Sequence, residues 1–291
     1  MESLTRGCGE EEKRLKSNKQ RQAAIFFAAA LLFLAVVTAA GVLCREAALE
    51  TDFSRKNLAP CREYWFGTDW MGRDMFARTL AGLSMSIRIG LCTAGVSACL
   101  ALLLGVAAAV MGKTADRVIS FLIDTIMGIP HLLLLILISY ALGKGFLGVA
   151  AGVALTHWPS LTRVIRGEVL QLKNSEFYQI SRKLGWGRGQ AAARHMLPHL
   201  VPQFTVGLIL MFPHAILHES SITFLGFGLS AKQPAIGVIL SESMRYLITG
   251  QWWLALFPGL MLVITVLLFD RAGNALRCLL EPMESREGFY G

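Results

Sequence analysis

Six long, uncharged apolar stretches constrain the fold of this chain more than any other feature of its sequence. They cover residues 23–44, 89–111, 125–143, 145–162, 200–218 and 246–269. Each is close to the roughly 17–25 residues that an α-helix needs to cross the hydrocarbon of a bilayer. Inside that hydrocarbon the backbone polar groups must bond within the segment, and a helix meets this requirement. The sequence therefore predicts an all-α polytopic membrane protein with six transmembrane helices.

The charge of the chain is better explained by membrane orientation than by a nucleic-acid partner. The formal net charge is +8 over 291 residues, a balance that can indicate nucleic-acid binding. The Lys and Arg residues, however, lie in the segments that flank the apolar stretches. We therefore expect the lipid bilayer, and no nucleic acid, among the partners. Six scattered cysteines are read as small apolar residues, with a disulfide between Cys44 and Cys61 as the minor alternative.

The distribution of Lys and Arg predicts which segments are cytoplasmic. Eighteen of the 28 lie in 1–22, 112–117, 163–199 and 271–291, and nine lie in 45–81, 143–145 and 223–245. Because cytoplasmic segments carry the excess of these residues, both termini are predicted to be inside. The expected organisation is a cytoplasmic tail (1–22), a first transmembrane helix (23–44), an external segment (45–81), a core of five spans (82–271) with a cytoplasmic loop (about 163–199), and a second cytoplasmic tail (272–291). The third span is expected to begin near Val118.

The cytoplasmic loop has the pattern of a helix, a turn and a second helix. Asn174 or Ser175 can cap a first helix that runs to Leu184. Phe177, Ile180 and Leu184 recur at helical spacing and share one face of it. An ordinary amphipathic helix on the membrane surface would show the same periodicity, so the pattern alone leaves both interpretations open.

Beyond the first helix, Gly185 allows a turn, and a second short helix is expected to end at Leu197-Pro198. This order resembles the EAA loop of permease subunits of binding-protein-dependent ABC importers, in which a triplet is followed by Gly and then by Leu-Pro. The triplet position holds Gln179-Ile180-Ser181, so bulkier residues replace the usual alanines. The resemblance assigns ATPase coupling to Glu176, Gln179, Ile180, Ser181, Leu184, Gly185, Leu197 and Pro198.

Four further stretches resemble the second permease subunit of the subgroup that imports dipeptides, oligopeptides and nickel. They are FGTDWMGRD at 66–74 and the segments 116–136, 158–173 and 219–229. The resemblance covers about residues 60–282, and it departs at 235–237, where Ala-Ile-Gly replaces a frequent Trp-Gly. It implies a type I ABC importer permease fold with a cytoplasmic EAA-type coupling loop. It also implies an inner (plasma) membrane location in a bacterium.

The resemblance further implies the partners of such a subunit. These are a second homologous permease, two cytoplasmic ATPase subunits and an extracytoplasmic solute-binding protein. The sequence contains no GxxxxGK[ST] phosphate-binding loop, since no Lys-Ser/Thr follows the GWGRG stretch at 185–189. We therefore expect a transport subunit that is not an enzyme, with no catalytic residues, no cofactor and no resident metal. ATP hydrolysis is expected on partner chains.

The external segment carries a charged, Gly-containing motif with Asp69, Arg73 and Asp74. Paired carboxylates can be catalytic, but a motif of this kind just outside a span is more often a turn fixed by ion pairs. The resemblance places it at the external face before the second span. There it is a candidate for the docking surface of the binding protein.

Histidines inside the apolar stretches are candidates for contact with the substrate. His214 and His218 lie four residues apart on one helix face, with Glu219 beside them, and His131 and His157 lie in two other spans. Ionisable residues in a membrane are costly and often functional. Two interpretations stay open, namely hydrogen bonding between helices and transient contact with a metal or metal chelate. The transported substrate is therefore expected to be a peptide, nickel or a metal chelate.

Two other classes of membrane protein fit the sequence less well. An ion-coupled secondary transporter could use Asp124, His214, Glu219 and Asp270, but neither inverted repeats nor broken midplane helices are visible in the sequence. An intramembrane hydrolase is disfavoured because GxSxG is absent and no Ser-His pair is convincingly spaced.

Overall fold

The computed structural model describes residues 2–280, and the regular structure within that range is helical. The one β pairing in this part of the chain is an isolated bridge between Thr68 and Asp74. The elements are α1 (Glu2–Leu43), η1 (Phe53–Arg55), α2 (Met75–Val110), α3 (Lys113–Gly128), α4 (His131–Ala141), α5 (Gly145–Lys173), α6 (Glu176–Lys183), α7 (Arg188–Ala191), the π-helical turn η2 (Ala192–Met196), α8 (Leu197–Phe224), α9 (Ile236–Leu247) and α10 (Trp253–Leu280). Cys44 and Cys61 are both free, so the minor alternative of a disulfide is not seen.

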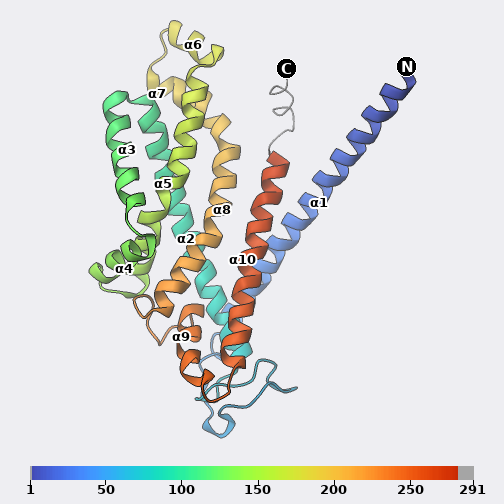
Figure 1. The fold of residues 1–291 in the computed structure, drawn as a ribbon, viewed down its shortest axis with the longest axis vertical. Coiled ribbons are helices and arrows are strands. Elements are labelled where there is room, and N and C mark those ends of the chain that lie inside the picture. Colours follow the sequence, from blue (N-terminus) through green and yellow to red (C-terminus); the bar gives the residue numbers. More distant parts are fainter. Residues whose placement is uncertain (1, 281–291) are drawn as a thin grey trace.

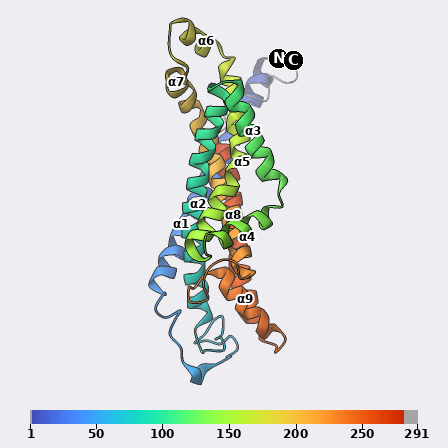
Figure 2. The ribbon, with the colours of Figure 1, turned by 90° about the vertical axis from the view of Figure 1, so that its left-hand side faces the viewer.

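The helices form an elongated bundle with different structures at its two ends (Figure 1). The long helices α2, α5, α8 and α10 run along the length of the molecule, and α1 diverges from them towards its N-terminal end. The start of α1, the end of α10 and the α6–α7 loop lie at one end, while α9 and the segment before α2 lie at the other. Figure 2 shows the same division from the side. The start of α1, the end of α10 and the predicted coupling loop therefore lie at the same end of the bundle.

Fewer helices than predicted have the length and apolar composition of a membrane span. Among residues 2–280 these are four, namely Asn18–Leu43 of α1, and α2, α8 and α10. The bent pair α3–α4 makes a fifth if it is counted as one span. The remaining predicted span, 145–162, lies in α5, whose apolar stretch is interrupted by His157, Pro159 and Ser160. The prediction of six spans is thus supported for four, or for five with the bent pair.

The predicted third span is broken in the middle. The axes of α3 and α4 differ by 98° across Ile129 and Pro130. Proline has no amide hydrogen to donate and disfavours helical geometry in the residue before it. Ile129 accordingly adopts an extended conformation, with φ −90° and ψ 137°. The break turns α4 across the bundle instead of along it (Figure 1).

Several predicted boundaries are also displaced. The second span begins at Met75 instead of 89, because Asp74 caps α2 by accepting a hydrogen bond from the backbone N–H of Phe76 at 2.9 Å. The last span begins at Trp253 instead of 246. The predicted tail 1–22 is helical from Glu2 and continuous with the first span. At the other end of the chain, α10 continues to Leu280 and so includes the first part of the tail predicted at 272–291. Residues 281–291 of that tail lie outside the described residues.

Small residues bring α2 and α5 into close contact at the centre of the bundle. A Cβ atom added to Gly105 of α2 would lie 2.8 Å from Cγ2 of Ile165 and 3.1 Å from the carbonyl oxygen of Thr162. Ser97 of α2 donates a hydrogen bond to the carbonyl oxygen of Ala154 at 2.5 Å. Close backbone approach through small residues and hydroxyl bonds between helices are the usual means of packing within a membrane. This contact fixes α5, which carries His157, against the core.

Candidate functional site

A cavity of about 730 Å³ lies beside the break between α3 and α4 and is also lined by α5 and α8. Most of its lining is apolar, including Met127 and Met211. The polar side chains that reach it are four histidines and two hydroxyls, namely His131, His157, His214, His218, Thr156 and Ser160. None of the 17 lining residues is Asp, Glu, Lys or Arg. The cavity therefore offers imidazole nitrogens, hydroxyls and thioether sulfurs to whatever enters it.

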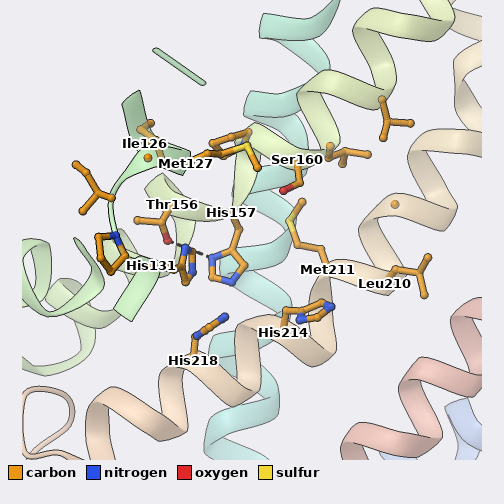
Figure 3. Close-up of a pocket in the computed structure, with 17 residues that line it drawn as sticks. Ile126, Met127, His131, Thr156, His157, Ser160, Leu210, Met211, His214 and His218 are labelled. Atoms are coloured by element: carbon orange, nitrogen blue, oxygen red, sulfur yellow. Dashed lines mark hydrogen bonds between the residues drawn. The ribbon is translucent and has the colours of Figure 1, made fainter. Parts of the chain in front are cut away.

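Three of the histidines converge from three different helices (Figure 3). The ring centroids of His131 and His157 are 4.7 Å apart, those of His131 and His218 are 4.4 Å apart, and those of His157 and His218 are 5.1 Å apart. One ring nitrogen from each lies within 4.8 Å of the others. His131 is the first residue of α4, so the break at Pro130 is what brings this ring to α5 and α8.

The hydrogen bonds of His157 determine which of its nitrogens faces a ligand. Its Nδ1 lies 2.8 Å from the carbonyl oxygen of Val153. A carbonyl can only accept, so we assign the proton to Nδ1 and a free lone pair to Nε2. The Nε2 atoms of His131 and His157 are buried and have no hydrogen-bond partner among the described residues. Since buried polar atoms are normally bonded, these two nitrogens are available to a ligand in the cavity.

The predicted substrate-contact residues do not all meet. His214 and His218 both line the cavity from α8, although only His218 belongs to the cluster of three. Glu219 is fully buried but is not among the lining residues, and its carboxylate accepts a hydrogen bond from Thr223 at 3.0 Å. Sequence reasoning noted His131 and His157 but did not place them beside His218. The signal that could have done so is the Ile129-Pro130 pair, which predicts a bend at that depth.

The predicted coupling loop lies at the opposite end of α5 and α8 from the external segment. The three predicted apolar residues of α6 and its C-cap are exposed, Phe177 at 40%, Ile180 at 55% and the C-cap Leu184 at 73% of their surface. Tyr178 and Ser181 on the other side are buried in the loop. This side of α6 is therefore an exposed apolar strip, on which the Phe177 ring also contacts His199 with ring centroids 5.5 Å apart. Exposed apolar strips often mark a surface that another protein binds.

The turn after α6 has the geometry expected for its glycine. Gly185 has φ +87°, in the left-handed region that residues with a side chain rarely adopt. Its surroundings are open, with no atom within 4 Å of an added Cβ. Leu197-Pro198 does not end a second helix as predicted. It begins α8 directly after η2, because proline is well tolerated in the first turn of a helix, where amide groups lack partners.

The other predicted coupling residues lie on or beside this turn. Glu176, Gln179 and Pro198 are exposed, and Leu197 is half-buried. The amide nitrogen of the Gln179 side chain donates to the carbonyl oxygen of Asn174 at 3.2 Å. Ser175 takes the cap position of α6 without a side-chain capping bond.

At the other end of the bundle, Asp69 is the centre of a buried ion network. Its Oδ2 atom accepts hydrogen bonds from Nε of Arg73 at 2.7 Å and from Nη1 of Arg78 at 2.6 Å. Nη2 of Arg78 also pairs with Glu242 of α9 at 3.0 Å. Asp69 is 0% exposed. These contacts fix the turn of the external segment onto α2 and α9.

The three residues predicted to dock a partner therefore differ in burial and in the contacts they make. Asp69 and Arg73 are buried in the ion network, and Asp74 is the half-buried cap of α2. Burial raises the pKa of Asp74 above its usual value, since the loss of solvation outweighs the backbone hydrogen bonds it accepts. Sequence reasoning missed Arg78 and Glu242, since their pairing joins residues 164 positions apart. The geometry is that of a turn held by ion pairs.

Comparisons with known proteins agree on one family. The family model described as "Binding-protein-dependent transport system inner membrane component" matches residues 101–281. The chain is 31% identical over 270 residues to the dipeptide transport system permease protein DppC of Bacillus subtilis (strain 168), covering 93% of this chain and 84% of the relative. It is 32% identical over 236 residues to the oligopeptide transport system permease protein OppC of the same organism, covering 79% of this chain and 77% of that relative.

A solved structure shares the fold. An inward-facing conformation of the MetNI methionine ABC transporter aligns with a TM-score of 0.58, covering 72% of this chain and 98% of the matched chain. The sequences are 16% identical, so this likeness concerns the fold alone.

Proposed function

The chain belongs to the family of binding-protein-dependent transport system inner membrane components and is a permease subunit of an ABC importer. From this we propose which part binds the ATPase, how the chain is oriented in the membrane and what class of solute it carries. The observation that carries the proposal is the exposed apolar strip of α6, formed by Phe177, Ile180 and Leu184, beside the left-handed turn at Gly185. In our proposal this strip is the docking surface for a separate ATPase subunit. Family membership itself implies an ATPase and a binding protein as partners.

The helices that flank the loop give it a mechanical route to the cavity. The loop begins at the end of α5 and ends at the start of α8. At 1.5 Å per residue, His157 lies roughly 24 Å along α5 from the loop, and His218 roughly 32 Å along α8. A rigid-body shift of α6, produced when the ATPase subunits close on ATP, would therefore move both of these cavity walls together. Such a shift between two packed states is a common form of switching.

The proposed orientation places the loop and both termini in the cytoplasm of a bacterium, with the chain in its plasma (inner) membrane. Two observations support it: the excess of Lys and Arg in those segments, and the position of the loop, the start of α1 and the end of α10 at one end of the bundle (Figure 1). The end that carries α9 and the external segment would then face the binding protein. A second cavity of about 780 Å³ lies there, lined in part by Trp70, Glu242 and Arg245.

We further propose that a second, homologous permease covers the α3–α4 side of the bundle and that two ATPase subunits serve the pair. Large apolar side chains are exposed on this side, among them Phe121 at 68%, Leu133 at 61% and Leu137 at 63%. The cavity is lined from the same side by 126–131. Pairing there would enclose a pathway between the two permeases.

The substrate class follows from the relatives and from the cavity. The relatives named above are dipeptide and oligopeptide permeases, which supports a small peptide as substrate. The histidine-rich cavity, which has no Asp, Glu, Lys or Arg in its lining, supports nickel or a metal chelate. We propose a small solute from these classes, delivered by the binding protein. The competing idea of an ion-coupled transporter loses support because the carboxylate of Asp124 is paired with Arg163 at 2.6 Å.

Photo-crosslinking from the loop tests this function. With a photoreactive amino acid at Leu184, we expect a covalent adduct in living cells whose partner is identified by mass spectrometry as an ATPase with a phosphate-binding loop. The matched control is the same substitution at Leu58, an exposed leucine at the other end of the bundle, which should give no such adduct. Since the ATPase is cytoplasmic, the adduct also tests orientation. An ATPase adduct from Leu58, or its absence from Leu184 at normal protein levels, would contradict the proposal.

A further inference from the structure

The cluster of His131, His157 and His218 has the composition of a transition-metal site. Neutral imidazole nitrogen is a preferred ligand for nickel, zinc and copper, whereas magnesium and calcium prefer oxygen. The cavity around the cluster adds two methionines and no carboxylate. A zwitterionic peptide would find no charged side chain in this lining, while a divalent ion would find three convergent nitrogens.

The hydrogen bonding of the cluster prepares its nitrogens for a metal. A metal-bound histidine commonly donates its second ring N–H to a backbone carbonyl, which fixes the tautomer and the orientation of the ring. His157 has this arrangement, with Nδ1 bonded to the carbonyl oxygen of Val153 at 2.8 Å and Nε2 unbonded. The unpartnered Nε2 of His131 lies beside it. A bound cation would satisfy both buried nitrogens.

The spacing of the three rings fits a site that closes on its ligand. The candidate ligand atoms lie within 4.8 Å of one another. Around a tetrahedral Zn²⁺ ion with zinc–nitrogen bonds of about 2.1 Å, they would be roughly 3.4 Å apart, and adjacent nitrogens of a square-planar Ni²⁺ site would be similarly closer than the observed spacing. Since the three histidines belong to α4, α5 and α8, a small relative movement of these helices changes the spacing. Three protein ligands also leave one position open to the cavity, as in sites that exchange a ligand.

From these observations we infer that His131, His157 and His218 bind a borderline divalent transition-metal ion, such as Ni²⁺, as cargo within the cavity. The inference rests on the proposed function and narrows its substrate class to a metal ion, either free or held by a small chelator at the open position. His214, one turn from His218 on α8, lies where it can contact the chelator or the passing ion. Because α5 and α8 flank the coupling loop, movement of the loop would loosen the site and release the ion.

Metal binding to the purified permease, assembled with its partner permease in lipid nanodiscs, tests the inference without transport or ATP. The probes are Ni²⁺ alone and Ni²⁺ with excess free histidine, measured by calorimetry. We expect one ion per chain in at least one of the two forms, and the form that binds identifies the source. His157→Gln or His218→Gln should weaken binding by about 100-fold or more, since even residues that only orient a ligand typically change affinity by about 10–100-fold. X-ray absorption should show nitrogen neighbours at about 2.0–2.1 Å.

The matched control is His199→Gln, which changes an exposed histidine at the start of α8 outside the cavity. It should bind as the unmodified protein does. The thermal unfolding midpoint of each variant shows that it is folded. His131→Gln is a third variant that removes one of the proposed metal-binding side chains. Binding unaltered in all three cluster variants, or lost equally in His199→Gln, would overturn the inference and reduce the cluster to a packing contact. Neither outcome depends on the ATPase adduct at Leu184, so the two proposals fail separately.

Discussion

Replacing Asp69 by Asn is expected to lower the free energy of unfolding by about 3–5 kcal/mol, because the substitution leaves two buried guanidinium groups without their carboxylate. Arg73 and Arg78 would then share Glu242, which reaches Arg73 only at 3.7 Å. Arg78 is 2% exposed, so water cannot replace the lost partner. The unfolding of the purified protein in detergent, followed by tryptophan fluorescence, measures the effect. Trp70 is a local reporter, since it stacks on Tyr246 with ring centroids 4.6 Å apart.

Asp74→Asn is the matched control for this prediction. It makes the same chemical change five residues away, at the cap of α2. Asn caps a helix about as well as Asp, so we expect a change within about 0.5 kcal/mol. If the two variants lose stability equally, or if Asp69→Asn unfolds like the unmodified protein, the external turn is not held by its buried ion pairs.

Gly185→Val is expected to reduce substrate uptake by roughly 5- to 30-fold while the protein still inserts and ATP is still hydrolysed. The left-handed conformation costs a residue with a side chain roughly 1–2 kcal/mol, which lowers the population of the native turn by that factor. No neighbour lies within 4 Å of the added Cβ, so the effect comes from the backbone and not from a clash. Uptake and ATP hydrolysis, measured together in proteoliposomes containing the complete transporter, check it.

Gly187→Val is the corresponding control in the same loop. Gly187 also has open surroundings, but its φ lies outside the left-handed region. Valine is therefore tolerated there, and we expect uptake within about two-fold of the unmodified transporter, the range of a surface substitution. Normal uptake by Gly185→Val, or equal losses in both variants, would remove the turn from the coupling mechanism.

Much of the fold follows from local patterns, and the remainder depends on contacts that a local pattern cannot reveal. The periodicity of Phe177, Ile180 and Leu184 predicted a helix that the structure contains, and Gly185 predicted its turn. The start of α2 was predicted 14 residues too late, at 89 instead of Met75. The cause is the charge of Arg88, which bounds the uncharged stretch at 89, whereas in the structure Arg88 lies inside α2 and its Nε donates to the carbonyl oxygen of Ser84 at 3.1 Å.

The candidate site likewise combines features that the local sequence predicted with contacts that it did not. His214 and His218 were paired from their spacing on one helix, which is a local property. The cluster instead joins His218 to residues that precede it by 61 and 87 positions, His157 and His131. That meeting depends on the bend at Pro130 and on the close packing of α5 against α2. Glu219, adjacent in sequence, lies outside the cavity lining because consecutive residues on a helix point in different directions.

A distance measurement between the two cavity walls tests most directly whether the loop drives the pathway. Spin labels at Val164 of α5 and Leu210 of α8 would report on that distance, since both side chains line the cavity. In the complete transporter with an ATPase-inactive partner, we expect ATP to shift the distance distribution in the unmodified chain and to leave it unchanged in Gly185→Val. One identical distribution with and without ATP in the unmodified chain, under conditions in which the transporter binds nucleotide, would contradict the proposed coupling.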